Sequence, residues 1–303
     1  MAISRAQLVK ELEPGLNALF GLEYDRYTNE TAEIFTTETS DRAFEEEVML
    51  SGFGSAATKA EGASVTFDDA KEAFTARYTH QTIALAFAIT EEAIEDNLYD
   101  RLGNRYARAL ARSMANTKQV KGAEILNNAF STSQLGGDGV VLCSTAHPTV
   151  SGTSLSNTFT TQADLSETSL ESALINIAAF IDERGLKISI QGTKLILPKE
   201  LQFTAERILK SPLRVGTADN DINAIANMNM IPEGYRVNHY LNDTNAWFIK
   251  TDTPNGFKHF VRAALRTAME GDFDTGNVRY KARERYSFGF SDPRCVYGSS
   301  GSS

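Results

Sequence analysis

The chain has 303 residues, a formal net charge of −9 and a pI near 5.1, with 42% hydrophobic and 23% charged residues. This length corresponds to about two domains of about 150 residues each, and no apolar run approaches the roughly 18 residues that would indicate a membrane span. The acidity argues against tight wrapping of nucleic acid, because that affinity comes mainly from Lys and Arg side chains that neutralise phosphates. With no apolar signal core near the N-terminus, we expect a soluble protein made in the cytoplasm.

The chain contains two cysteines, Cys143 and Cys295, and four histidines. Two thiols are too few for a disulfide framework, and neither cysteine lies in a CxxC or Cys/His spacing that builds a zinc site. We therefore expect two reduced thiols, no metal centre and no cofactor.

The first segment of the chain has the pattern of an amphipathic helix. Apolar residues recur at every fourth position: Leu8, Leu12, Leu16 and Phe20. Pro14 and Gly15 interrupt this stripe, and a proline inside a helix removes a backbone hydrogen bond. The pattern predicts a broken amphipathic arm whose apolar side needs a partner to cover it.

A long hairpin or extended loop is predicted next. Two β-prone segments, FEEEVML (44–50) and VTFDDAKEAFTARYTH (65–80), flank a stretch rich in Gly, Ser and Ala, SGFGSAATKAEGAS (51–64). In residues 83–90 large apolar residues alternate with small ones, which is typical of a half-buried strand.

A long helix is predicted after this strand. Thr90 is a suitable N-cap, and apolar residues then recur at every fourth position: Ile94, Leu98, Leu102, Tyr106, Leu110 and Met114. The helix is expected to span residues 90–130, which at about 1.5 Å per residue makes a rod of about 60 Å. We expect it to act as a structural spine.

The second half of the chain mixes helices and strands. Residues 131–165 are rich in Ser, Thr and Gly and predict a long loop. The elements predicted after it are a helix with a stripe from Leu170 to Ile181 that ends at Gly185, strands at 187–190 and 193–198, a helix at 200–211, and two strands around an Asn-Asp turn in 235–252. Because no βαβ repeat or internal period occurs, we expect an α+β fold.

A basic stripe is predicted near the C-terminus. Residues 277–290, NVRYKARERYSFGF, have the pattern of a long strand, in which alternate side chains point the same way. The side chains that share one face are Arg279, Lys281, Arg283 and Arg285. This stripe could pair with an acidic surface of a neighbouring subunit, face nucleic acid, or be a solvated sheet edge that discourages aggregation.

The stretch LCSTAHPTVSGTSLSN (142–157) places Cys143, Ser144 and His147 close together in sequence. A catalytic nucleophile also needs an orienting third group and an oxyanion hole, and the GxSxG elbow of many hydrolases is absent. The favoured interpretation is a loop whose hydroxyls bond backbone groups, with His147-Pro148 forcing an extended turn. A Ser/Cys-His hydrolase using residues 143–147 stays as an alternative.

The order of these elements resembles a known family. An N-terminal arm, a long hairpin with a small-residue tip, a spine helix, a mixed block and a closing long strand are similar to the major capsid proteins of tailed bacteriophages, which share the HK-ninety-seven fold with encapsulins. The segments that carry the likeness at motif level are RAFEEEVMLSGFG, FAITEEAIEDNLYDRL, ALARSM, LCSTAHP and ERYSFGFSDPRCVYG.

The resemblance implies a division of the chain into the parts of that fold. These are an N-arm (1–40), an E-loop (41–82), a first part of the P-domain (83–165) that holds the spine helix, an A-domain (166–255), and a P-domain return strand with a C-terminal tail (256–303). We expect the final GSSGSS of this tail to be disordered.

The function implied by the resemblance is structural, not enzymatic. Hexamers and pentamers of the chain would close into an icosahedral head around double-stranded DNA, in a virion assembled in the bacterial cytoplasm, with portal, scaffolding and decoration proteins as further partners. The residues expected at subunit contacts are Leu8, Leu12, Phe53, Lys59, Glu61, Arg279, Arg283 and Arg285.

Two points stay open within this resemblance. An encapsulin-type compartment has the same fold but loads an enzyme in place of a genome. Some relatives join an E-loop lysine covalently to a neighbour's asparagine, and Lys59 lies where such a lysine is expected. Because the sequence does not identify the matching Asn or an assisting Glu, we expect contacts that are not covalent.

Overall fold

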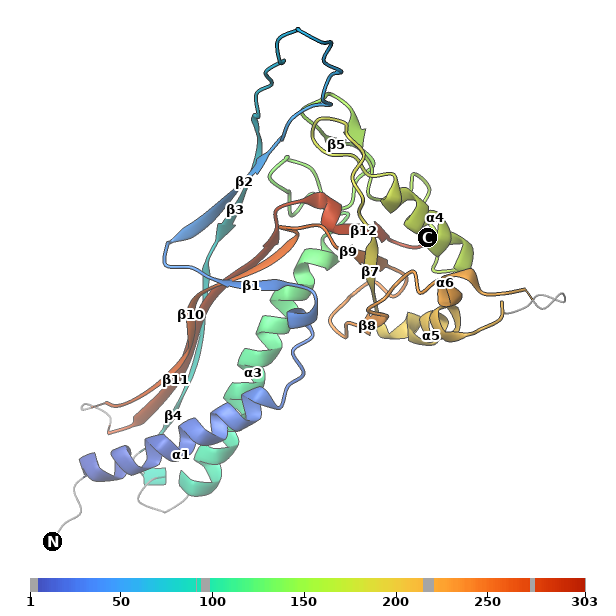
Figure 1. The fold of residues 1–303 in the computed structure, drawn as a ribbon. Coiled ribbons are helices and arrows are strands. Elements are labelled where there is room, and N and C mark those ends of the chain that lie inside the picture. The colour runs from blue at the N-terminus through green and yellow to red at the C-terminus, as the bar shows by residue number, and fades with distance from the viewer. Residues whose placement is uncertain (1–4, 91, 94–98, 215–220, 273–275, 303) are drawn as a thin grey trace.

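The computed structural model describes residues 5–90, 92–93, 99–214, 221–272 and 276–302. The molecule is elongated, with a long hairpin at one end, two helices beside a long sheet at the other end, and a smaller helix-covered sheet at the side (Figure 1). This arrangement is the α+β mixture that the sequence predicts.

The first sheet has four strands in the order β1-β10-β11-β4. Their bounds are Thr36–Thr39 for β1, Phe257–Gly271 for β10, Val278–Phe290 for β11 and Gln81–Ile89 for β4. β1 runs parallel to β10, and the other two pairings are antiparallel. The two strands expected at 83–90 and 277–290 are confirmed, whereas β10 was not predicted, although its Leu265, Thr267 and Met269 alternate with exposed residues as strand side chains do.

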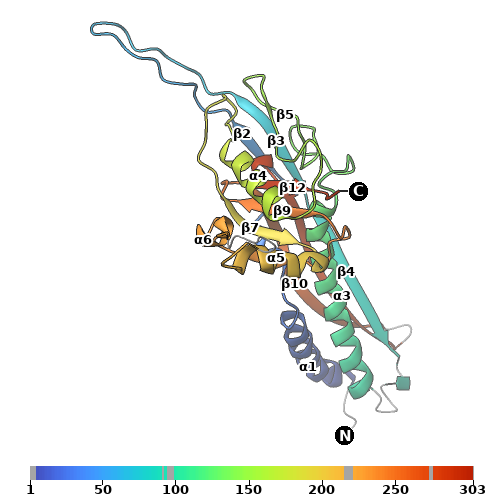
Figure 2. The same cartoon turned by 90° about the vertical axis from the view of Figure 1, so that its right-hand side faces the viewer.

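The helices α1 (Arg5–Asp25) and α3 (Tyr99–Asn127) cover one face of this sheet (Figure 2). Their shared core consists of Leu16, Phe20, Ala107, Leu110, Ala111, Met114, Tyr280 and Ala282. Asn17 of α1 accepts hydrogen bonds from Tyr280 (2.8 Å) and Thr267 (2.7 Å). The apolar side of the arm is therefore covered, from Leu16 onward, by the chain's own spine helix and sheet.

The predicted break in the first helix is wrong. α1 continues through Pro14 and Gly15 without interruption. The hydrogen bond that proline removes is one local loss, whereas the burial of Leu16 and Phe20 against α3 and β11 stabilises the continuous helix. The side chains of Leu8 and Leu12 lie outside the part of the structure that is described.

The spine helix is confirmed as α3, with 29 residues. At the start of the predicted helix, the backbone N–H of Ala93 lies 3.4 Å from the Thr90 hydroxyl, as expected of an N-cap. Residues 94–98 of the expected range lie outside the described residues. Near its C-terminal end, Gly122 lets the helix approach the 3-10 turn η1 (Thr31–Glu33), because a Cβ there would lie 2.2 Å from Thr31 Cγ2.

The predicted hairpin is formed by β2 (Phe44–Leu50) and β3 (Glu72–Thr79), which pair antiparallel. Only His80 separates β3 from β4, so one extended stretch of chain belongs first to the hairpin and then to the sheet. The connecting residues, 51–71, form a tip that projects far beyond the rest of the molecule (Figure 2). We call β2, β3 and this tip the extended hairpin.

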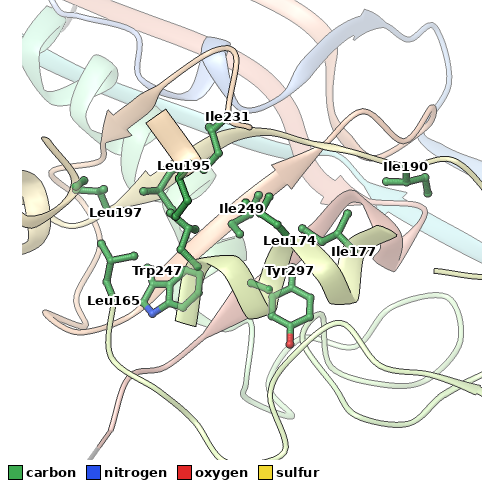
Figure 3. Packing of buried hydrophobic residues seen from close by; sticks show 14 of the residues in the cluster. Leu165, Leu174, Ile177, Ile190, Leu195, Leu197, Ile231, Trp247, Ile249 and Tyr297 are labelled. Carbon is green, nitrogen blue, oxygen red and sulfur yellow. The ribbon is translucent and has the colours of Figure 1, made fainter. Parts of the chain in front are cut away.

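The second sheet has the order β12-β9-β7-β8. Its strands are β7 (Gly192–Leu197), β8 (Tyr235–Val237), β9 (Trp247–Thr251) and β12 (Val296–Ser299), and the helices beside it are α4 (Glu167–Ala178), α5 (Gln202–Lys210) and α6 (Ala224–Asn227). A buried cluster between this sheet and α4 includes Trp247, Tyr297, Leu195, Ile249 and Ile177 (Figure 3).

Three local predictions in this region are corrected. The two strands around the Asn-Asp turn are β8 and β9, but they do not pair, because β7 lies between them. Residues 187–190 form no strand and make one isolated bridge, from Lys187 to Ile181. The helix α4 ends at Ala178, and Gly185, with φ +83°, lies in a later turn.

The C-terminal residues are ordered through 302, contrary to the expected disordered tail. Ser299, the last residue of β12, is fully buried, and its hydroxyl donates to the Ala163 carbonyl at 2.7 Å. Ser302 donates to the Asp164 carboxylate at 2.6 Å. The last segment thus joins the second sheet, where sequence periodicity alone does not place it.

The packing of α1 predicts unequal effects of two substitutions on the same helix. Phe20 is 2% exposed and Leu22 is 73% exposed. Phe20→Ala should lower the free energy of unfolding of unassembled subunits by about 3–5 kcal/mol, because it leaves a cavity against α3 and β11. Leu22→Ala should change it by less than about 0.5 kcal/mol. Denaturant unfolding followed by circular dichroism measures both, and equal effects would contradict the described packing.

Candidate functional site

In the loop formed by residues 142–157, both ring nitrogens of His147 make contacts with other side chains. His147 is 1% exposed, its Nδ1 lies 2.6 Å from Asp138 Oδ2, and its Nε2 lies 3.2 Å from Asn157 Oδ1. Asn157 Nδ2 donates to the carbonyls of Leu142 (2.7 Å) and Pro293 (2.9 Å). This cluster therefore fastens the loop to the C-terminal segment.

The candidate nucleophiles of this loop do not meet the histidine. Burial raises the pKa of the Cys143 thiol, which keeps it protonated and unreactive. The Ser144 hydroxyl accepts from the backbone N–H of Ala146 at 3.1 Å, as a turn hydroxyl does. The arrangement supports the interpretation of this loop as structural. It does not pair Cys143 or Ser144 with His147 as the nucleophile and base that a hydrolase needs.

A metal site and a membrane-spanning helix are both absent from the part of the chain that the structure describes. No group of three or more His, Cys, Asp or Glu residues is placed to hold a metal ion there. None of its helices combines the length and the apolar character needed to cross a bilayer.

The extended hairpin exposes an unusual amount of apolar surface. Its large exposed apolar residues are Phe44, Val48, Leu50, Phe53, Val65 and Phe67, of which Phe67 is 94% exposed. Lys59 and Glu61 are also exposed, at the end of the tip. An apolar projection of this kind is typical of a surface that a partner covers.

An ion pair holds the near part of the tip against the second half of the chain. Arg184, in the turn after α4, lies 2.8 Å from Asp68, and the Gly54 backbone N–H donates to the same carboxylate at 2.7 Å. The Gly54 N–H and the Arg184 guanidinium hold the pKa of Asp68 below its usual range. The two sides of the tip are thereby joined at Gly54 and Asp68, and residues 55–67 extend beyond this point.

The base of the extended hairpin is fixed to the first sheet by buried polar groups. Lys258 of β10 binds Glu38 of β1 and, at 3.1 Å, Glu47 of β2. The carboxylate of Glu47 also accepts from Ser291, whose hydroxyl bonds that of Tyr78. These contacts therefore fix the angle at which the hairpin projects from the first sheet.

His80 adds a second polar contact at this base, at the junction of β3 and β4. Its two ring nitrogens lie 3.0 Å from the hydroxyls of Ser287 and Ser40. Burial, with Arg285 nearby, lowers the pKa of His80, so the ring stays neutral at pH 7.

The basic stripe is confirmed, but it is not a sheet edge. Arg279, Lys281 and Arg283 are exposed on one face of β11 and Arg285 is half-buried, while Tyr280 on the other face is covered by the helices. β11 is an inner strand, between β10 and β4, so the edge interpretation is wrong.

Small residues flank this stripe on its β4 side. In the register of the sheet, Arg279 lies opposite Ala88, Lys281 opposite Ala86 and Arg283 opposite Ala84. These alanines cannot cover their cationic neighbours, so the stripe is open to a partner. Local sequence patterns do not show this feature, because the pairing of β4 with β11 is a long-range contact.

A family model described as phage capsid protein matches residues 71–299, which is more than half of the chain. The chain belongs to the phage capsid protein family. No curated protein matches the sequence significantly.

Solved structures show the same fold at low sequence identity. The procapsid of bacteriophage JBD30 aligns with a TM-score of 0.53 and 15% identity over 98% of this chain and 76% of that chain. The capsid of an empty GTA particle aligns with a TM-score of 0.51 and 14% identity over 89% of each chain. A virus-like particle from Pyrococcus furiosus aligns with a TM-score of 0.50 and 12% identity over 93% of this chain and 97% of that chain.

As a member of the phage capsid protein family, the chain is a structural protein and not an enzyme. Its fold is the α+β fold of phage capsids, as the resemblance implied. The loop with His147 is thus a structural part of a capsid subunit.

The burial of both thiols predicts their reactivity. Cys143 and Cys295 are buried, and burial raises the pKa of each. A thiol reagent such as DTNB should label neither cysteine in folded subunits and both after unfolding in guanidinium, because only an accessible thiolate reacts. Rapid labelling of the native protein would show that a thiol is accessible to solvent and would favour the hydrolase alternative at residues 143–147.

Proposed function

We propose that the chain is the major subunit of an icosahedral phage head, in which hexamers and pentamers enclose double-stranded DNA. The observation that carries the proposal is the match of the phage capsid model to residues 71–299, together with an extended hairpin whose apolar side chains a single copy leaves in water. An exposed apolar projection of this kind marks a surface that a neighbouring molecule covers.

The parts of the chain correspond to those of the family's fold in this proposal. The extended hairpin is the E-loop, α1 belongs to the N-arm, the first sheet with α3 makes up the P-domain, and the second sheet with α4 and α5 makes up the A-domain. β12 adds the C-terminal residues to the A-domain sheet, so the return segment of 256–303 contributes to both domains.

The contact residues fall into two groups in this proposal. Phe53, Lys59 and Glu61 lie on the exposed tip of the extended hairpin, and Arg279, Arg283 and Arg285 lie on the basic stripe. The stripe is cationic and exposed, which suits a contact with acidic groups of a neighbouring copy. Leu8 and Leu12 complete the set as contacts of the N-arm.

The net charge of −9 suits a container for DNA, because weak attraction to phosphates lets the genome enter and leave. Assembly takes place in the cytoplasm of a bacterial host, with portal, scaffolding and decoration proteins as partners. No feature of the described residues favours the encapsulin alternative, and the packaged contents of the shell distinguish the two.

The role of the extended hairpin predicts a defect of assembly and not of folding. Deletion of residues 52–62 removes the exposed end of the tip together with the Gly54 contact to Asp68, and it leaves β2 and β3 intact. The variant should keep the circular dichroism spectrum and thermal midpoint of the parent and should form no closed shells in negative-stain electron microscopy and light scattering. Normal shells from this deletion would refute the assignment of the hairpin as the locking element.

Contacts between subunits are expected to be noncovalent. Assembled shells boiled in SDS should therefore give a single band at the mass of the monomer, 33.2 kDa. Lys59→Ala should give the same single band. A ladder of multimers that disappears in the Lys59 variant would instead show a covalent bond at this lysine.

A further inference from the structure

The outer strand of the first sheet has an open edge that lacks the usual protection. β4 is nine residues long, QTIALAFAI, and contains no charged residue, proline or glycine. It pairs with β11 in unbroken register from Gln81 to Ile89. Long, regular and uncharged edges offer free N–H and C=O groups to any other strand, and most proteins blunt them with charges, bulges, prolines or covering loops.

The exposure of Leu85 confirms that nothing in the described chain covers this edge. Leu85 points to the helix-covered face, where its partner in β11, Ala282, is fully buried. Leu85 itself is 47% exposed. The other outer strands of the two sheets have three or four residues each, so β4 is the long open edge among the described strands.

A second segment of the chain has the complementary property. Residues 63–67 of the tip, ASVTF, are rich in β-branched and aromatic residues but belong to no described strand. Val65 is 64% exposed and Phe67 is 94% exposed. Apolar and polar side chains alternate along this segment, which is the pattern of a strand with one face buried and one face in water.

We propose that residues 63–67 of one copy add to β4 of a second copy as a fifth strand of its first sheet. Val65 and Phe67 then lie on the side of Leu85, and Ser64 and Thr66 lie beside the alanines of the opposite face. The second copy is the occupant because the tip projects away from its own sheet (Figure 1).

The face of the sheet that carries Arg279 and Lys281 is open next to β4. An open groove of about 650 Å³ lies there, and its lining includes Ala86, Arg279, Lys281, Glu270 and Asp272. In the proposed contact, backbone pairing along β4 sets the direction of the added strand.

Amide hydrogen exchange tests the pairing directly, because strand addition protects backbone groups of β4 that β11 does not use. In unassembled subunits the outward-facing amides of residues 81–89 should exchange fast, and in shells they should exchange at least about tenfold more slowly. The inference rests on the proposed function. Shells in which these amides still exchange fast would overturn the strand addition alone, whereas a parent protein that never forms shells would overturn both.

Proline substitutions in the tip provide a second test that depends on the backbone. Proline lacks the N–H that a ladder needs, and residues 63–67 lie in no described strand, so the subunit itself should fold normally. Neighbouring N–H groups in a strand point in opposite directions. One of Thr66→Pro and Val65→Pro therefore removes a ladder bond in either orientation of the added strand.

The controls are Thr66→Ala and Val65→Ala, which keep the N–H. At least one proline variant should need about tenfold more protein to assemble than its alanine control, as measured by light scattering. If both proline variants assemble like their controls, residues 63–67 do not pair as a strand and the inference is wrong.

Discussion

A buried lysine is central to the polar contacts that hold the base of the extended hairpin. Lys258 of the first sheet is shared between Glu38 of β1 and Glu47 of β2, so it joins the fixed sheet to the element that leaves it. A buried ammonium without a carboxylate partner would stay away from water without compensation, so Lys258 favours the arrangement in which both elements lie beside it. The angle of the hairpin is therefore part of the folded state of each subunit and is present before subunits meet.

The same geometry explains why the isolated subunit has features that a monomer would avoid. The hairpin exposes Phe53 and Phe67, and the sheet presents an uncharged outer strand and an uncovered stripe of cations. Each of these is a liability in a monomer, and contact with a second copy would cover it.

The loop with Cys143 and His147 shows how proximity in sequence misleads. Four positions separate a thiol from an imidazole, yet the folded chain gives the histidine to Asp138 and Asn157 and buries the thiol elsewhere. A buried histidine needs hydrogen-bonding partners wherever it lies, and here those partners fasten a long loop to the C-terminal segment. The hydrogen bonds of His147 with Asp138 and Asn157 therefore stabilise the fold.

The sequence by itself determined the features that arise from short-range periodicity. The spine helix, the hairpin strands and the alternation of Arg279, Lys281 and Arg283 were all readable from neighbouring positions, because side-chain direction repeats every 3.6 residues in a helix and every two in a strand. The family likeness followed from the order of these elements.

Only the tertiary structure decided which elements meet. Pro14 predicts a break, but the burial of Leu16 and Phe20 on α3 keeps α1 continuous. The Asn-Asp turn predicts that β8 and β9 are neighbours, but β7 pairs with both, and the segment expected to be a tail contributes to β12. That β11 is an inner strand and β4 an open edge depends on pairing between residues nearly 200 positions apart, which no local pattern encodes.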